Sequence, residues 1–416
     1  MFVIVPVGTS AKLVRKPTVT LLLIGLNTIV YFLELVVFFS GGSKALQRLF
    51  EELGFIPISP KVYTLFTSMF VHDAPFPFHL AGNMLYLWIF GRYIEDVLGS
   101  IIYAIFYMTS QLGAIAMQTV ALKFFNASLL SVPQVGASGA IAALLGLFVV
   151  RFYHERVKLF YAYQIWFRYC DYGTIYLPST LVLGGWFVLE IVNGVISLAS
   201  HNASVGHWAH VGGFLVGVLA ALLFGSLKEA QVESLISCAR QSIGCSMWRH
   251  AERHLRRAIK ANQRHVVARL LLSLVLAHSR RTDEARKHLQ VALKESAQLN
   301  PDEEMALSEC FLELGEKLLM TLLELSTPEM KFDIALLLER IGNHELAIRA
   351  FNSVASEETA DEETKALAML RCAEILLRDF NDKESALRLL SELCERFPSS
   401  QWVTLARHII QKVAHG

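Results

Sequence analysis

The sequence predicts an all-α chain in which a polytopic six-helix transmembrane bundle precedes a soluble domain of α-helical repeats. Hydrophobic residues make up 54% of the 416 positions, yet nearly all long apolar runs lie in residues 1–225. Residues 226–416 are rich in Glu, Arg, Lys, Leu and Ala, with helical periodicity and hardly any strand pattern. The shift in composition near Ser226 therefore predicts two domains, 1–225 and 226–416.

The first domain contains apolar segments that approach the length of about 20 residues needed to span a membrane as a helix. We expect six such spans, at 19–39, 78–98, 101–122, 138–152, 176–197 and 207–224. The second and the fourth are short or flanked by polar residues. The fourth begins at Ser138, so we expect this serine to lie below the membrane surface.

Basic residues indicate the orientation, because Lys and Arg favour the cytoplasmic side of a membrane. They gather before the first span, between the fourth and fifth, and after the sixth (Lys12, Arg15, Lys16, Arg151, Arg156, Lys158, Arg168 and Lys228). The loop 123–135 has only Lys123, and the loop 198–206 has no Lys or Arg. We therefore expect a multi-pass integral protein of a bacterial inner (cell) membrane, with both termini in the cytoplasm. The net charge of +1 and the lack of a basic tract argue against a nucleic-acid partner.

Polar residues interrupt the membrane domain at three places. His79 and Asn83 are four positions apart, so on a helix they share one face. Ser138 lies in Gly-Ala-Ser-Gly-Ala, and His210 begins a glycine-rich stretch. Because polar side chains are costly in lipid, they usually face a cavity or a partner. The predicted spans place all three groups near the outer membrane face, which one cavity open to the outside would explain.

The chemistry expected at this cavity is nucleophilic. A serine hydroxyl becomes a good nucleophile when a base within hydrogen-bond reach takes its proton, and His210 is the candidate base for Ser138. Gly213 and Gly217 lie on the same helix face as His210, where small residues allow close helix packing. Gly139, with Gly136, supplies the matching small surface beside Ser138.

Three donors are predicted to stabilise the anionic intermediate. The side chains of His79 and Asn83 and the backbone N–H of Ser138 would form an oxyanion hole, worth about 2.7–4 kcal/mol per donor. No Asp or Glu obviously completes a triad, and Glu190, in mid-span, is expected to make interhelical hydrogen bonds. The prediction is a Ser138–His210 dyad. His207 and His210 lack an apparent third metal ligand, so we expect neither a metal nor a cofactor.

Jointly, these residues resemble the rhomboid family of intramembrane serine proteases. The matching elements are His79-xxx-Asn83, Gly136-x-Ser138-Gly139 and Ala209-His210-xx-Gly213-xxx-Gly217, in that order. Gly91-xxx-Glu95-xxx-Gly99 is similar to the family pattern after the second span. The resemblance covers about residues 17–225.

The resemblance implies a six-helix bundle with a water-accessible site below the outer surface. It implies that Ser138 is the nucleophile, His210 the general base, and His79 and Asn83 oxyanion-hole side chains. It also implies a first loop, about 40–77, partly in the membrane, and a fifth helix that gates substrate entry. In some members an aromatic residue four positions after the serine stacks on the histidine, whereas Ala142 occupies that position here.

The second domain contains an internal repeat. Ala251-xx-His254-Leu255-xx-Ala258 recurs 34 residues later as Ala285-xx-His288-Leu289-xx-Ala292. This is the tetratricopeptide period, in which small alanines let paired helices pack closely. Looser copies begin at Ala347 and Ala386, Gly342 marks a turn, and residues 296–330 are out of register. The concave surface of such an array suits a peptide or protein ligand.

The function predicted is serine-type endopeptidase activity on peptide bonds in or near transmembrane segments of membrane-protein substrates. The alternative is a non-proteolytic rhomboid-like protein that binds or escorts membrane clients; this class would lack Ser138 or His210, and both are present. A transporter with a proton path through His79, His210 and Glu190 predicts internal symmetry, which the sequence does not show.

Overall fold

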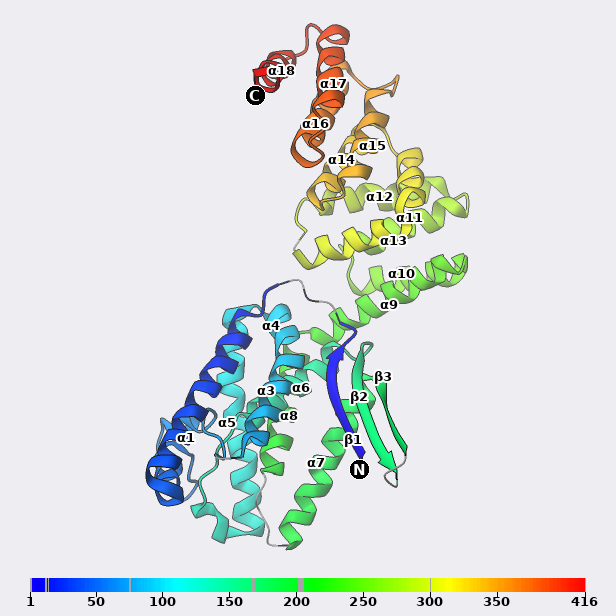
Figure 1. Cartoon of the computed structure of the whole chain (residues 1–416). Coiled ribbons are helices and arrows are strands. Elements are labelled where there is room, and N and C mark those ends of the chain that lie inside the picture. Colours follow the sequence, from blue (N-terminus) through cyan, green and yellow to red (C-terminus); the bar gives the residue numbers. More distant parts are fainter. Residues whose placement is uncertain are drawn as a thin grey trace. The chain divides into compact units, whose positions relative to one another are not determined.

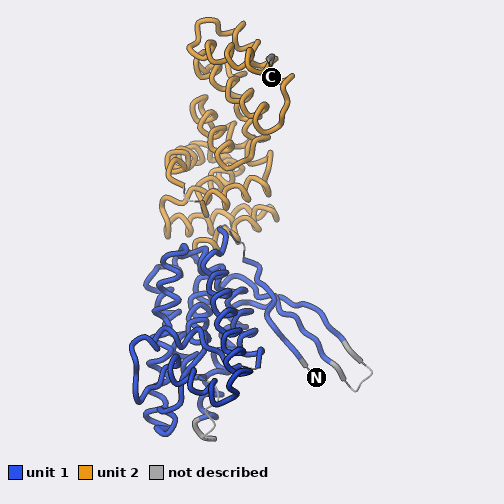
Figure 2. Tube along the Cα trace, turned by 60° about the vertical axis from the view of Figure 1, so that its left-hand side comes forward, with its two compact units in different colours: residues 1–230 blue, residues 231–416 orange. Residues whose placement is uncertain are grey.

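The chain folds into two compact units, residues 1–230 and 231–416 (Figure 2). The computed structural model describes residues 2–11, 13, 15–74, 76–165, 169–200, 206–299 and 301–415. Lys12 and Arg168, which belong to the predicted charge pattern, lie outside the described residues, as does most of the loop 198–206.

Unit 1 is a bundle of helices with a small sheet beside it (Figure 1). Its helices are α1 (Thr18–Leu53), α2 (Thr64–Thr67), α3 (Pro77–Tyr86), α4 (Arg92–Leu98), α5 (Ser100–Phe125), α6 (Ser138–Arg151), α7 (Ser179–Ser200) and α8 (His207–Leu223), with a π turn η1 (Leu87–Gly91) and a 3₁₀ turn η2 (Ala127–Ser131). Eleven of the fourteen residues of α6 are buried. A helix that is apolar all round belongs in the interior, and α6 forms the centre of this unit.

Not all of the six expected spans have spanning length. Within the described residues, α1, α5 and α7 are long and apolar enough to cross a membrane, and a fourth span results if α8 and the following helix, bent by 71°, count as one. The segment expected at 78–98 is divided among α3, η1 and α4. Helix α6 has 14 residues, about 21 Å at 1.5 Å per residue, against a hydrocarbon core of about 30 Å.

The prediction of an all-α chain is wrong, because unit 1 contains a three-stranded antiparallel sheet. Its strands are β1 (Phe2–Thr9), β2 (Arg156–Ile165) and β3 (Tyr169–Pro178), in the order β1-β2-β3 (Figure 1). These segments are rich in aromatic and β-branched residues, which favour strands. The interspersed basic residues favoured a cytoplasmic loop instead. Because β3 continues to Pro178, α7 begins at Ser179 and not at the expected position 176.

The motif Gly91-xxx-Glu95-xxx-Gly99 connects α4 to the start of α1. Glu95 Oε1 and Oε2 accept the backbone N–H groups of Val19 and Thr20 at 2.8 Å each. A carboxylate on the free N–H groups of a helix N-terminus is stabilising. A Cβ on Gly91 would lie 2.7 Å from the hydroxyl of Tyr103, so this glycine allows η1 and α5 to approach each other.

Helices α6 and α8 touch backbone to backbone through glycines. A Cβ on Gly213 would lie 2.0 Å from the carbonyl oxygen of Gly139, and one on Gly217 would lie 1.9 Å from that of Ala143. From the other side, a Cβ on Gly146 would lie 2.1 Å from the carbonyl oxygen of Phe214. No side chain fits at these three positions unless the helices separate.

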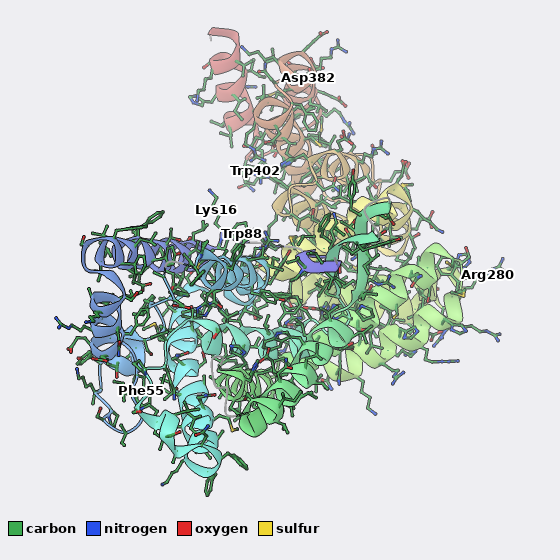
Figure 3. The ribbon with its side chains drawn as sticks, turned by 60° about the horizontal axis from the view of Figure 1, so that its bottom comes forward. Lys16, Phe55, Trp88, Arg280, Asp382 and Trp402 are labelled. Carbon is green, nitrogen blue, oxygen red and sulfur yellow. The ribbon has the colours of Figure 1, made fainter. Side chains whose placement is uncertain are left out.

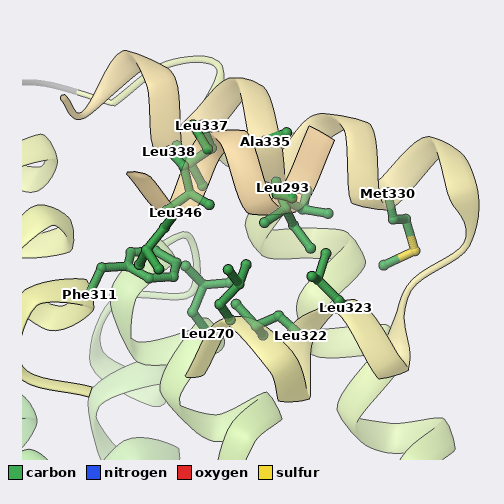
Figure 4. Packing of buried hydrophobic residues seen from close by; sticks show 14 of the residues in the cluster. Leu270, Leu293, Phe311, Leu322, Leu323, Met330, Ala335, Leu337, Leu338 and Leu346 are labelled. Carbon is green, nitrogen blue, oxygen red and sulfur yellow. The ribbon is translucent and has the colours of Figure 1, made fainter. Parts of the chain in front are cut away.

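Unit 2 is an array of paired helices. They are α9 (Ser226–Gly244), which begins at the end of unit 1, α10 (Trp248–Ala261), α11 (Val266–His278), α12 (Thr282–Ser296), α13 (Pro301–Leu325), α14 (Pro328–Arg340), α15 (His344–Ala355), α16 (Glu362–Asp379), α17 (Lys383–Arg396) and α18 (Val403–His415). The repeated alanines and leucines, Ala251 and Leu255 in α10 and Ala285 and Leu289 in α12, are fully buried. Figure 4 shows the apolar core that the helices of this unit share.

The out-of-register segment of the sequence corresponds to the long helix α13, which is broken at Gly315. The expected turn at Gly342 separates α14 from α15, and its φ of +78° is a conformation that glycine adopts without strain. The register of the 34-residue repeat is lost where one long, broken helix follows the pair α11 and α12.

Replacement of a contact glycine tests the packing of α6 on α8. Gly217→Val places a side chain against the backbone of Ala143, and overpacking of this kind costs about 1–3 kcal/mol. We expect the melting temperature of the chain in detergent to fall by roughly 5–10 °C. Gly185→Val in α7, where a Cβ has no neighbour within 4 Å, is the control and should change it little. Equal melting temperatures for the two variants would contradict the packing.

Thiol reactivity tests the fold of unit 2. Burial raises the pKa of the Cys310 and Cys372 thiols to about 12 from the ordinary 9.0, which lowers the thiolate fraction about 10³-fold at neutral pH. Cys238 and Cys245 are exposed. In the native chain at pH 8, we expect a maleimide to label the exposed pair within minutes. Cys310 and Cys372 should react only after unfolding; rapid native labelling of either would show that this core is not formed.

Candidate functional site

Ser138 is the first residue of α6, and the segment before it is anchored to the first loop. Phe55, labelled in Figure 3, and Gln134 exchange two backbone hydrogen bonds, at 3.0 and 2.8 Å. The N–H of Gly136 donates to the carbonyl of Ser68 at 2.8 Å. These bonds place the N-terminus of α6, and with it the serine, at a defined position.

A cavity of about 740 Å³ contains the residues predicted for the site. Its lining includes Ser138, His210, His79 and Asn83, which come from α6, α8 and α3. The sequence separates these residues by up to 131 positions, and the fold brings all four to one cavity. Gly136 and Gly139 line it too, whereas Gly213 and Gly217 lie at the contact between α6 and α8 described above.

Gly136 lies beside the side chains of both His79 and Ser138. Its φ is +111°, a conformation that side chains rarely adopt. A Cβ at this position would lie 3.2 Å from Nε2 of His79 and 3.9 Å from Oγ of Ser138. Glycine is therefore required both by the backbone and by the space between these two side chains.

Asn83 is held by His72, which the sequence analysis did not include in the site. Nδ1 of His72 lies 3.2 Å from the carbonyl oxygen of Phe70, so Nδ1 donates and Nε2 accepts. Nδ2 of Asn83 lies 3.1 Å from this Nε2 and donates to it. The amide has a second N–H, which leaves one donor for the cavity.

His72 is itself fixed from α1. Its backbone N–H donates to Oε1 of Glu34 at 2.9 Å, and the side chains of His72 and Glu34 are fully buried. The rings of His72 and His79 have centroids 5.2 Å apart. The signal in the sequence is a histidine seven positions before His79, but the proline-rich stretch beside it indicates a loop residue.

His210 contacts α7 through a carboxylate and an indole. Its Nδ1 lies 2.8 Å from Oε2 of Glu190, and the same oxygen lies 2.7 Å from Nδ1 of His207. The expected interhelical bonding of Glu190 is confirmed, but its partner is the candidate base itself. The ring of Trp186 lies 5.9 Å from that of His210, so an aromatic neighbour comes from α7 in place of Ala142.

Glu190, His207 and His210 also form a cluster whose candidate ligand atoms lie within 4.8 Å of one another. The expectation that the two histidines lack a third candidate ligand is therefore wrong. Ligands of a tetrahedral zinc with bonds of about 2.0–2.1 Å lie roughly 3.3 Å apart. The separations of 2.7 and 2.8 Å are those of hydrogen bonds, which favours a directly bonded cluster.

Comparison with known proteins identifies both units. Residues 59–227 match the model of the rhomboid domain, and residues 248–300 match that of a tetratricopeptide repeat. The chain thus joins a segment that matches the rhomboid domain to a segment that matches tetratricopeptide repeats. Its long apolar helices are those of a membrane protein.

Two relatives are rhomboid proteins. "Rhomboid protein 1, mitochondrial" of Saccharomyces cerevisiae is 29% identical over 165 residues, which are 39% of this chain and 42% of that protein. "RHOMBOID-like protein 1" of Arabidopsis thaliana is 27% identical over 179 residues, 42% of this chain and 39% of that protein. The chain therefore spans about two fifths of the length of these curated relatives.

Solved structures are similar to part of the chain, and one of them is a tetratricopeptide-repeat protein. It is described as "YrrB: a TPR protein with an unusual peptide-binding site", with 18% identity and a TM-score of 0.19. The match covers 42% of this chain and 90% of that one.

Proposed function

We propose that this chain is an intramembrane serine endopeptidase that cleaves peptide bonds in or near the transmembrane segments of membrane-protein substrates. The observation that carries the proposal is the single cavity lined by Ser138, His210, His79 and Asn83 in a rhomboid domain. Three separate helices, α3, α6 and α8, bring these four polar side chains to one cavity, which a shared chemical role explains better than separate structural ones.

The proposed chemistry is acyl transfer. Ser138 Oγ attacks the scissile carbonyl carbon while His210 takes the hydroxyl proton. The resulting oxyanion receives hydrogen bonds from Asn83 Nδ2, His79 and the N–H of Ser138. When the C–N bond breaks, His210 gives the proton to the leaving amine. Water, activated by His210, then hydrolyses the acyl-enzyme and restores Ser138.

The membrane arrangement we propose has six helical elements, α1, α3 with α4, α5, α6, α7 and α8, and both termini in the cytoplasm of a bacterium. The short α6 supports it, since a helix of about 21 Å that ends near one surface starts well below the other. Ser138 would then lie inside the membrane, in a cavity open to the outer side. A substrate helix must unwind there, because an intact helix uses its carbonyls in its own hydrogen bonds.

The repeat unit is proposed to bind a peptide or protein ligand on the cytoplasmic side. The tetratricopeptide match at 248–300 supports this role, since stacked helical pairs present extended concave surfaces. The chemistry of the site does not involve this unit, so deletion of the repeats would alter substrate choice or regulation.

Substitution of the dyad tests the proteolytic function. In detergent with a model transmembrane substrate, we expect Ser138→Ala and His210→Ala each to lower the cleavage rate at least about 10³-fold. Asn83→Ala should lower it about 10²–10³-fold through loss of an oxyanion donor. Ser131→Ala, an exposed serine in η2, is the matched control and should cleave at the wild-type rate.

Cleavage that survives Ser138→Ala or His210→Ala would contradict the dyad. A wild-type chain that binds transmembrane substrates but cleaves none of a broad set would favour the non-proteolytic escort function.

A further inference from the structure

Glu190 is a buried carboxylate in a helix whose neighbouring positions are apolar and exposed. In α7, the adjacent Val188 and Leu189 are 57% and 59% exposed, whereas Glu190 is 9% exposed. An ionisable side chain in a membrane helix is costly unless a partner compensates it. The partners here are on α8, because Glu190 Oε2 contacts both His207 and His210.

The chemistry of this contact determines where the imidazole protons lie. A carboxylate only accepts hydrogen bonds, so each histidine must donate from Nδ1. A neutral histidine carries one ring proton, and with that proton on Nδ1 of His210 its Nε2 has a free lone pair. Nε2 is the nitrogen that remains to take the proton of Ser138. The opposite tautomer would have no lone pair to offer on that side of the ring.

We infer that Glu190 is a positioning residue, which holds His210 in the Nδ1–H tautomer and makes the site a Ser138–His210–Glu190 triad; the inference rests on the proposed function. In this role Glu190 acts through its hydrogen bond with His210. As the reaction proceeds, its negative charge stabilises the imidazolium that forms.

Two further contacts restrain the side chains of Glu190 and His210. Trp186 lies one helical turn before Glu190, and its ring centroid is 5.9 Å from that of His210 at an interplanar angle of 35°. The imidazole is thus restrained by an aromatic face as well as by the hydrogen bond. His207 donates to the same oxygen as His210, which restrains the rotamer of Glu190. Both Trp186 and Glu190 belong to α7, so this helix orients the base.

Kinetic measurements on the full chain test the inference. We expect Glu190→Gln and Glu190→Ala to lower kcat by about 10²–10⁴-fold with KM within about threefold, since the tautomer and not substrate binding is disturbed. Glu190→Asp keeps the carboxylate, so its kcat should be at least tenfold higher than that of Glu190→Gln. His207→Gln removes only the second donor to Glu190, so it should lower kcat at least tenfold less than Glu190→Gln does. Equal kcat for wild type and Glu190→Gln would overturn the inference.

A spectroscopic measurement separates this inference from the proposed function. In Ser138→Ala chain labelled with ¹⁵N-histidine, the NMR signals of neutral His210 should show the proton on Nδ1. In Ser138→Ala/Glu190→Ala they should move toward the Nε2–H tautomer. An unchanged tautomer would overturn the role of Glu190 even if the wild type cleaves substrate. A tautomer change between these variants, together with a wild type that cleaves no substrate, would support the contact and refute the protease.

Metal analysis of the purified wild type decides between the triad and a zinc site. The inference predicts substoichiometric zinc and full cleavage in the presence of a chelator. One equivalent of zinc in the active chain, lost in His207→Gln together with activity, would mean that Glu190, His207 and His210 hold a metal, and would overturn the triad.

Discussion

The backbone contact between α6 and α8 is the constraint on which the site depends. At three positions of this contact the residue is glycine, and a carbonyl oxygen of the facing helix lies about 2 Å from where its Cβ would stand. Two residues near the same end of these helices, Ser138 and His210, are therefore brought to one cavity. A larger residue at Gly213 or Gly217 would separate the helices, and the candidate nucleophile would lose its base without any change in either residue.

Other elements of unit 1 position the residues around this cavity. Backbone hydrogen bonds to Phe55 and Ser68 of the first loop position the segment that precedes α6. Glu34 of α1 accepts a hydrogen bond from His72, and His72 in turn accepts one from Asn83. Helix α7 contributes Glu190 and Trp186 to His210. Asn83 and His210 thus each have a neighbour that fixes their orientation, as a preorganised site requires.

The sequence indicates the residues of the candidate site more clearly than the residues that orient them. Ser138, His210, His79 and Asn83 stand in short motifs with fixed spacing, and the glycines beside them indicate the contact of their helices. His72 and Glu190 could not be assigned, because their roles depend on contacts across 11 and 20 positions, which no local period reveals. The 34-residue period predicts the helical repeats. Strand β2 is obscured by Arg156 and Lys158, which favour a cytoplasmic loop, and strand β3 runs into the expected start of the fifth span. The break at η1 shows that one apolar run, here 78–98, need not form a single regular helix.

The most direct test of this account is the identity of the residue that reacts with a fluorophosphonate probe. The account predicts that mass spectrometry of the labelled chain finds the adduct on Ser138, that His210→Ala abolishes it, and that Gly217→Val strongly reduces it although both reactive residues are intact. An adduct on another serine, or equal labelling of Ser138 in Gly217→Val and in the wild type, would contradict the claim that the glycine contact of α6 and α8 assembles the site.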